Sequence, residues 1–360
     1  MARAGIHESD LCEHVVEQFV CERQRRGYRL RGYTGVIGIF LENLRRQRLI
    51  AAPERIPDRS ELGLLKRRYG QYLKRERGLT ETTVTRYQGI IDRFLTDRFD
   101  GKPLRLEVLS PSDIADFVRS RARSASPSGA SLTVTALCSF LRFLFQCGEI
   151  PTNLAACVPS VARWRQDSVP KYLNTEQVKR LLKACDRNTS TGRRDYAILL
   201  LLARLGFRAS EVVNLELEDI DWRNGEITVP GKGLVRDRLP LPVDVGEAVA
   251  MYLSRDRCKC PTRQVFLCMK APRRGFASAG AVSTLVRRAI LRAGLDPPLK
   301  GAHLLRHSLA TGMLRRGASM VEIGEILRHR TPASTEIYAK VDFKSLRAIA
   351  LPWPSEESCL

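Results

Sequence analysis

Three of the five histidines in this chain lie in one short segment that ends in a tyrosine. From the first of these histidines to the tyrosine, the sequence is HLLRHSLATGMLRRGASMVEIGEILRHRTPASTEIY. His303, His307 and His329 can exchange protons near neutral pH, and Tyr338 offers a hydroxyl nucleophile. Arg306 follows His303 by three residues, a spacing that places both on one face of a helix. The segment therefore holds groups that can attack an ester and move the proton that the attack releases.

Two cationic residues upstream favour an anionic target. Arg208 follows an apolar helical pattern in AILLLLARLGFRASE, so its charge emerges beside buried residues, where it is costly without an anionic partner. Lys232 lies between two glycines in PGKGLVRDRLPL, a turn that lets a lysine reach into a groove and transfer a proton. Arginine binds phosphate oxygens in bidentate fashion. Together with Tyr338, these residues favour chemistry at a phosphodiester.

These motifs resemble the catalytic domain of the tyrosine recombinases, the phage integrase family. The resemblance implies that Arg208 and Arg306 clamp the scissile phosphate and that Tyr338 is the nucleophile. It also implies that Lys232 protonates the 5′-hydroxyl leaving group. The expected reaction cuts and rejoins DNA through a 3′-phosphotyrosyl intermediate, which conserves the bond energy and needs no ATP. The implied fold is mainly α-helical with a small antiparallel β-sheet.

The resemblance assigns supporting roles to the remaining polar residues. His303 would hydrogen-bond the nucleophile or move its proton, and His329 would brace the phosphate. Glu211, one helical turn after the first clamp arginine, would support that arginine and the histidine. We expect His307 to pack behind the site, because the next residue on a helix points about 100° away. Arg328 stands where the family usually has a small residue.

No cofactor and no metal ion are expected. The chain has neither a Walker-type glycine loop nor a carboxylate triad for two-metal catalysis. Cys258, Cys260 and Cys268 include a C-x-C pair that is unusual for zinc, and a fourth ligand is missing. The ten cysteines show no disulfide spacing, and most lie in apolar helical patterns. We predict reduced, buried thiols.

The charge of the chain favours a polyanionic partner. It has 60 Lys+Arg against 39 Asp+Glu, a formal net charge of +21, while 44% hydrophobic residues indicate a folded protein. A membrane surface is the alternative partner, but no apolar run approaches the roughly 20 residues of a spanning helix. The start, MARAGIHESD, lacks the apolar region of a signal peptide. We expect a cytoplasmic protein that binds double-stranded DNA and no membrane.

Four segments are predicted along the chain. Residues 1–58 form an N-terminal helical extension, and residues 59–165 resemble the helical, SAM-like core-binding domain of the family. Residues 166–351 form the catalytic domain, and residues 352–360 form a tail. In the catalytic domain, helical patterns at 175–185, 195–206 and 209–216 precede strands at 220–222, 226–229 and 236–242. The tripeptide RNG between the first two strands predicts a hairpin.

Basic residues crowd the first two helices of the core-binding domain. Seven lie between residues 66 and 86, with two acidic residues among them. A surface of this composition favours contact with phosphates, although a single basic residue on a helix is usually only solvated. The predicted DNA contacts are Lys66, Arg67, Lys74, Arg75 and Arg86, with Arg236 in the catalytic domain.

The sequence leaves the biological role open. An active recombinase of a mobile element, such as a transposon, plasmid or phage, is favoured because a minimal dimer-resolution enzyme needs no extension like residues 1–58. The alternatives are a housekeeping dimer-resolution recombinase, a catalytically inactive DNA-binding relative and a type IB topoisomerase. Exchange of two duplexes requires four cleavages, so we expect a tetramer on DNA, formed by this chain alone or with a related recombinase. Whether the tyrosine acts in its own active site or in a neighbour's is left open.

The basic composition makes a prediction about salt. If several phosphates are neutralised, the logarithm of the affinity for duplex DNA falls linearly with the logarithm of the salt concentration. For six to ten contacts, the loss is about 10³- to 10⁵-fold between roughly 50 and 200 mM salt. Fluorescence anisotropy of a labelled duplex over a KCl series measures this slope. A slope near zero would contradict a phosphate-binding surface.

Overall fold

A computed structural model describes residues 60–100, 103–161, 169–230, 236–271 and 273–342, together with isolated helical positions elsewhere. The predicted N-terminal extension and the tail therefore lie almost entirely outside the described residues, and so does Lys232. The chain divides into two compact units, Met1–Arg165 and Gln166–Leu360. Each unit has its own hydrophobic core.

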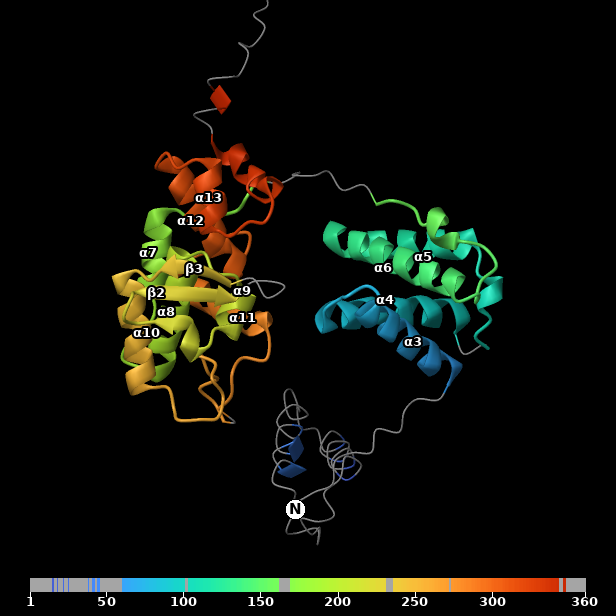
Figure 1. Cartoon of the computed structure of the whole chain (residues 1–360), viewed down its shortest axis with the longest axis horizontal. Coiled ribbons are helices and arrows are strands. Elements are labelled where there is room, and N and C mark those ends of the chain that lie inside the picture. The colour runs from blue at the N-terminus through green and yellow to red at the C-terminus, as the bar shows by residue number, and fades with distance from the viewer. Residues whose placement is uncertain are drawn as a thin grey trace, which may run out of the picture. The chain divides into compact units, whose positions relative to one another are not determined.

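The described part of the first unit is helical (Figure 1). Its elements are α3 (Glu61–Arg75), α4 (Glu81–Phe99), η3 (Leu106–Val108), α5 (Pro111–Ser124), α6 (Pro127–Gln146) and η4 (Leu154–Cys157). Helix α6 packs on α3, α4, α5 and η4, and its Leu137, Phe140 and Leu144 are completely buried. The start of α5 follows from SPSD: the Ser110 hydroxyl accepts from the Asp113 backbone, and the Asp113 carboxylate accepts from the Ser110 backbone.

Two expectations from composition were wrong. Helix α6 spans 20 residues with a mean hydropathy of 1.4, so it does have the length and composition of a membrane span. Half of that stretch is buried inside the unit, and the core helix of a folded domain passes the same test. The thiols in the described part of the chain are free but not uniformly buried, because Cys147 and Cys157 are exposed and Cys185 is buried. Cys147 follows the end of α6, where the packed face stops.

The second unit surrounds one long buried helix. Its helices are α7 (Thr175–Lys183), α8 (Ser190–Arg204), α9 (Ala209–Asn214), η5 (Leu217–Asp219), α10 (Val243–Arg255), α11 (Ala279–Arg292), α12 (Ala302–Arg315), α13 (Met320–Ile326), η6 (Pro332–Ser334) and η7 (Glu336–Val341). Helix α8 contacts α7, α9, α10 and α12, and residues 197–202 are at most 1% exposed. The apolar run AILLLL is therefore buried on all sides, as a helix that is hydrophobic all round must be.

A three-stranded antiparallel sheet completes this unit, in the order β1 (Ile220–Asp221), β2 (Glu226–Pro230), β3 (Arg236–Pro240) (Figure 1). Ile227 on the central strand pairs with Ile220 and with Leu239, and all three join the core. Gly225 adopts a φ of 65° in the β1–β2 turn, as the hairpin signal predicts. The predicted fold, mainly helical with a small antiparallel sheet, is confirmed.

The turn between α8 and α9 brings a cationic side chain to the surface of this core. Helix α8 ends at Arg204, and Gly206 follows with a φ of 59°. A Cβ added at Gly206 would lie 2.7 Å from Cδ2 of Leu327 and 3.1 Å from Cδ2 of Leu309. Only glycine satisfies both the left-handed conformation and this close approach. Arg208 begins α9 two residues later.

We predict that Gly206→Ala destabilises the protein more than Gly225→Ala. Both substitutions place a Cβ on a left-handed residue, at a cost of about 1 kcal/mol. The Gly225 Cβ would meet nothing within 4 Å, whereas the Gly206 Cβ would clash with Leu327. Overpacking of this kind adds roughly 1–3 kcal/mol. Urea unfolding of both variants measures the difference, and equal free energies of unfolding would contradict the steric account.

Candidate active site

Arg208 and Glu211 form a capping pair at the start of α9. The Arg208 backbone N–H donates to Oε2 of Glu211 at 2.8 Å, and Nη1 of Arg208 donates to Oε1 at 2.5 Å. Nη2 of Arg208 donates to the Arg328 carbonyl at 3.2 Å. The Arg208 side chain is 37% exposed and that of Glu211 only 5%. The exposed guanidinium is thus held by a buried carboxylate, in an orientation open to an anion.

Arg306 lies on α12, with its guanidinium buried against two backbone carbonyls. It donates to the carbonyl oxygens of Gly206 and Leu327, and the residue is 4% exposed. Burial lowers the pKa of Arg306 to about 10, with further lowering by Arg208 and Arg328. The two predicted clamp arginines therefore meet at the same turn. Arg306 ties this turn to the end of α13, and Arg208 emerges from it.

Glu211 is the carboxylate that this cluster shares. Burial would raise its pKa, but the charges of Arg328 and Arg208 and their hydrogen bonds keep the pKa below the usual value. Nη2 of Arg328 donates to Oε2 of Glu211 at 2.8 Å. Glu211 is bonded to Arg208, while its predicted role in supporting that arginine and the histidine stays a prediction. The part played by Arg328 was missed, because its position after α13 gave no sign that it reaches α9.

Tyr338 lies in η7, buried in a small cluster with Ala310, Ile323, Leu327 and Val341. It is 1% exposed. Burial raises the pKa of Tyr338 to about 12, although Arg306 lowers it in part. The nearby cations are therefore not enough to favour the phenolate in this state. Loss of water around a buried hydroxyl outweighs the attraction of the arginine.

His307, not His303, contacts the tyrosine. Nδ1 of His307 lies 2.9 Å from the Tyr338 hydroxyl oxygen, with the two rings edge to face. His303 is exposed, and its ring centroid lies 6.4 Å from that of His307. His307, expected to pack behind the site, packs on the Tyr338 ring and also lies within hydrogen-bonding distance of its hydroxyl. The three-residue spacing predicts that His303 and Arg306 share a helical face. It does not indicate the side from which η7 approaches α12.

His329 lies beside the same tyrosine. Its ring is parallel to that of Tyr338, with centroids 6.4 Å apart. Nδ1 of His329 lies 2.7 Å from the Thr335 hydroxyl, and the Thr335 carbonyl accepts from the Tyr338 backbone N–H at 2.9 Å. Burial, with help from Arg306, lowers the pKa of His329 to about 4. Burial and the neighbouring His303 also lower the pKa of His307 to about 4. Both rings are neutral at pH 7.

The predicted DNA contacts differ in their surroundings. Lys66 is half-buried and forms an ion pair with Asp92, and Lys74 pairs with Glu81 at 2.7 Å. Arg236 donates to Asp219 at 3.3 Å but remains largely exposed. Arg67, Arg75 and Arg86 are exposed on α3 and α4. The exposed arginines are better placed for phosphate contact than Lys66, whose charge is already matched.

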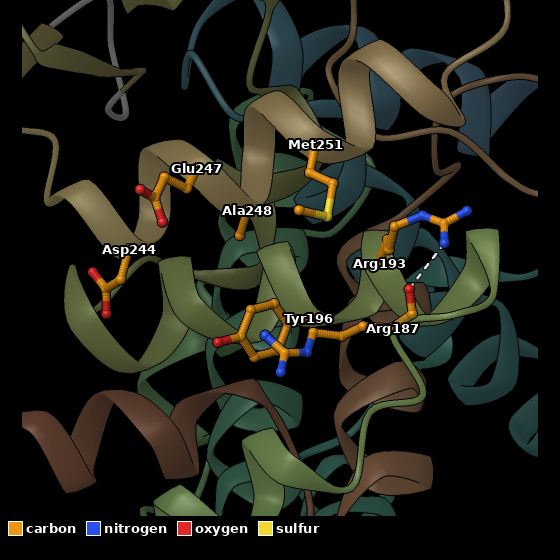
Figure 2. A pocket seen from close by; sticks show the side chains of 7 residues that line it. All are labelled: Arg187, Arg193, Tyr196, Asp244, Glu247, Ala248 and Met251. Carbon is orange, nitrogen blue, oxygen red and sulfur yellow. Dashed lines mark hydrogen bonds between the residues drawn. The ribbon is translucent and has the colours of Figure 1, made fainter.

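A separate hollow lies on the α8–α10 side of the second unit (Figure 2). Its lining includes Arg187, Tyr196, Asp244 and Met251, with none of the predicted catalytic residues. The Arg187 guanidinium lies 5.0 Å from the centroid of the Tyr196 ring. Within the described residues, no group of three or more His, Cys, Asp or Glu is placed to hold a metal ion. The cluster around Arg208 and Tyr338 is therefore the candidate active site.

Known proteins match both units. Residues 171–345 match the phage integrase family, and residues 67–148 match the phage integrase N-terminal SAM-like domain. The putative integrase/recombinase y4rA of Sinorhizobium fredii is 48% identical over 288 residues, which are 80% of this chain and 70% of that protein. The chain belongs to the phage integrase family. It is a tyrosine-type site-specific recombinase, similar also to tyrosine recombinase XerD of Listeria innocua, at 28% identity over 74% of this chain and 90% of that protein.

Solved recombinases share the fold. The XerH recombinase in a post-cleavage complex with its difH substrate has a TM-score of 0.63 at 18% identity, covering 82% of this chain and 97% of that one. A lambda integrase fragment, a dimer bound to a core site, has a TM-score of 0.59 at 18% identity, covering 81% and 97%. At such identities the comparison concerns architecture. The helices and the sheet that carry the site in this recombinase are those of the family fold.

We predict that His307 and His329 titrate near pH 4 rather than 6.5. Because both pKa values are lowered in the folded state, the unfolded chain binds more protons between these values. Stability is therefore complete above pH 6.5 and declines as the pH falls towards 4. NMR titration of the imidazole resonances, assigned with His307→Asn and His329→Asn, measures the pKa values. Inflections near 6.5 for both rings would contradict the buried, neutral arrangement.

Proposed function

We propose that this recombinase cuts and rejoins double-stranded DNA through a 3′-phosphotyrosyl intermediate on Tyr338, in the integration or transposition of a mobile element. The observation that carries the proposal is the placement of the tyrosine. Its hydroxyl contacts His307 at 2.9 Å, and Arg306, which shares a turn with the exposed Arg208, packs against the segment that leads to η7. A phosphodiester held by the arginines would lie next to a nucleophile that already has a base.

The proposed step moves one proton at each end of the displacement. The Tyr338 oxygen attacks phosphorus as the bond to the 5′-oxygen breaks, and neutral His307 accepts the phenol proton. Lys232 protonates the departing 5′-oxygen. Arg208 stabilises the charge that develops on the non-bridging oxygens, and Arg306, which is 4% exposed, would do so once DNA binding frees it from the carbonyls of Gly206 and Leu327. The reverse reaction by a new 5′-hydroxyl rejoins the strand without ATP, because the phosphotyrosyl ester retains the bond energy.

The buried tyrosine sets a condition on this step. At 1% exposure, Tyr338 cannot reach a bound backbone phosphate in the described arrangement. A pKa of about 12 also makes the free phenolate rare at neutral pH. We infer that η7 shifts when DNA binds, and that deprotonation accompanies attack. His307 is suited to this role because it is neutral at pH 7 and can accept the proton.

The proposed partners follow from the chemistry and the relatives. Strand exchange between two duplexes requires four cleavages, and one Tyr338 per chain implies four protomers, either identical or shared with a related recombinase. Lambda integrase, with a TM-score of 0.58 to this chain, has been solved as a tetramer bound to a Holliday junction. The exposed Arg75 and Arg86 of the first unit are proposed phosphate contacts. We place the activity in the cytoplasm, on DNA.

A housekeeping role in resolving replicon dimers is the second candidate. Tyrosine recombinase XerC of Shewanella amazonensis is 30% identical over 285 residues, covering 78% of this chain and 93% of that protein. The higher identity to the putative integrase/recombinase y4rA, 48%, favours the mobile-element role. Residues 1–58 add length that a minimal dimer-resolution enzyme does not require. Flanking repeats or neighbouring recombinase genes around the coding sequence would decide between the two roles.

The sharpest test is Tyr338→Phe. Phenylalanine keeps the ring packing, so the variant should fold and bind DNA like the wild type, but it should form no covalent adduct with a nicked suicide substrate carrying the recombination site. Denaturing gels measure the adduct. Tyr196→Phe, in the hollow on α8, is the matched control and should cleave normally. Wild-type adduct levels in Tyr338→Phe would show that another residue is the nucleophile.

A further inference from the structure

Arg328 has an unusual backbone conformation for an arginine. It lies between α13 and η6 with a φ of 54°, in the left-handed region. This region is unfavourable for any residue with a Cβ, and glycine occupies it most easily. An arginine in this position must therefore be held there by its side chain.

The side chain of Arg328 is buried and extensively bonded. Its exposed fraction is 4%. Nη1 donates to the carbonyl oxygens of Leu205 at 3.2 Å and Ile326 at 3.0 Å. Nη2 donates to Oε2 of Glu211 at 2.8 Å, and the guanidinium carbon lies 5.2 Å from the centre of the Phe207 ring. These contacts connect the end of α13 to the turn that carries the first clamp arginine.

Arg328 reaches Arg208 by two routes. Its backbone carbonyl accepts directly from Nη2 of Arg208 at 3.2 Å. Its side chain binds one oxygen of Glu211 at 2.8 Å, and the other oxygen accepts from Nη1 of Arg208 at 2.5 Å. Both terminal nitrogens of Arg208 are thus fixed, one by the main chain of Arg328 and one through the carboxylate that Arg328 holds.

The charges of this cluster do not balance. Arg208, Arg306 and Arg328 gather around Glu211, the carboxylate to which two of them are bonded. An added phosphate would offset the excess positive charge. Of the three side chains, Arg208 is the one with substantial exposure, 37%, whereas that of Arg328 is 4% exposed. Arg328 therefore cannot touch the DNA backbone itself in this arrangement, and it acts on the phosphate through Arg208.

We propose that Arg328 is a positioning residue that fixes the Arg208 guanidinium for the scissile phosphate. This inference rests on the proposed phosphotyrosyl reaction. A rotation of Glu211 would release Nη1 of Arg208, and the bond from Arg328 opposes that rotation together with the bond from the Arg208 backbone N–H. The effect belongs to the cleavage step, because the phosphate contacts that dominate DNA affinity lie along the whole duplex.

The test compares Arg328→Gly and Arg328→Lys in the full-length protein. Glycine accepts a φ of 54° without strain, so Arg328→Gly should fold, and lysine keeps the charge but loses the fork that spans Glu211 and the carbonyls. Single-turnover adduct formation on the suicide substrate should fall by about 10- to 100-fold in Arg328→Gly. It should recover in part in Arg328→Lys. Duplex affinity should stay close to wild type, whereas the unfolding midpoint should fall in both variants because buried Glu211 loses a bonded partner.

A double-mutant cycle with Glu211→Gln tests the route. If Arg328 acts through Glu211, Arg328→Gly should slow cleavage much less in the Glu211→Gln background than in the wild-type background. Arg316→Ala, at the exposed residue directly after α12, is the control for loss of one positive charge, and it should cleave at the wild-type rate. Fully additive effects in the cycle would overturn the proposed route.

Failure of the inference and failure of the proposed reaction give different results. If the wild type forms the adduct and Arg328→Gly forms it equally fast, the positioning role is wrong while the reaction stands. If the wild type forms no adduct on its own site, the proposed reaction fails and the inference fails with it. Equal losses of cleavage in Arg328→Gly and Arg328→Lys would show a purely structural role and overturn the inference.

Discussion

One buried carboxylate organises the active site. Glu211 is 4% exposed, and burial alone would favour its neutral form. The charges of Arg328 and Arg208 keep it ionised, and the carboxylate in turn holds both guanidiniums in place. Removing it would leave cationic groups gathered at one turn with their shared counter-charge gone, a costly arrangement. The orientation of the clamp, and hence the position of any bound phosphate, depends on this interaction.

Around Tyr338, burial has a larger effect on the pKa values than the neighbouring charges, the reverse of the situation at Glu211. Here burial wins over charge: it raises the pKa of Tyr338 to about 12 and lowers the pKa of His307 and His329 to about 4. The nucleophile and its histidines are therefore neutral at pH 7, while the arginines keep an excess of positive charge. In the proposed reaction, an arriving phosphate would supply the missing negative charge to the arginines. The phenol proton would move only as far as the adjacent imidazole of His307.

Local sequence patterns predicted most elements but not how they meet. The apolar run in α8 and the RNG hairpin are local signals, and each appears where expected. The Arg208–Glu211 pair also follows from a spacing of three residues. The His307–Tyr338 contact joins residues 31 apart, and the Arg328–Glu211 bond joins residues 117 apart. Helical periodicity cannot give such contacts, because they depend on the angle at which η7 and the end of α13 approach α12 and α9.

The clamp and the nucleophile are held by different forces, and this separation has a mechanical consequence. Guanidinium bonds to carbonyls and to Glu211 fix the turn at Gly206, the side chain of Arg306 and the segment at Leu327. Tyr338 is held instead by apolar neighbours and by His307. The bond between His329 and Thr335 anchors the start of η7 beside the clamp. In the proposed reaction, a movement of η7 at Thr335 would expose the Tyr338 hydroxyl without breaking the bonds that hold Arg208, so the two sides of the site would be assembled separately.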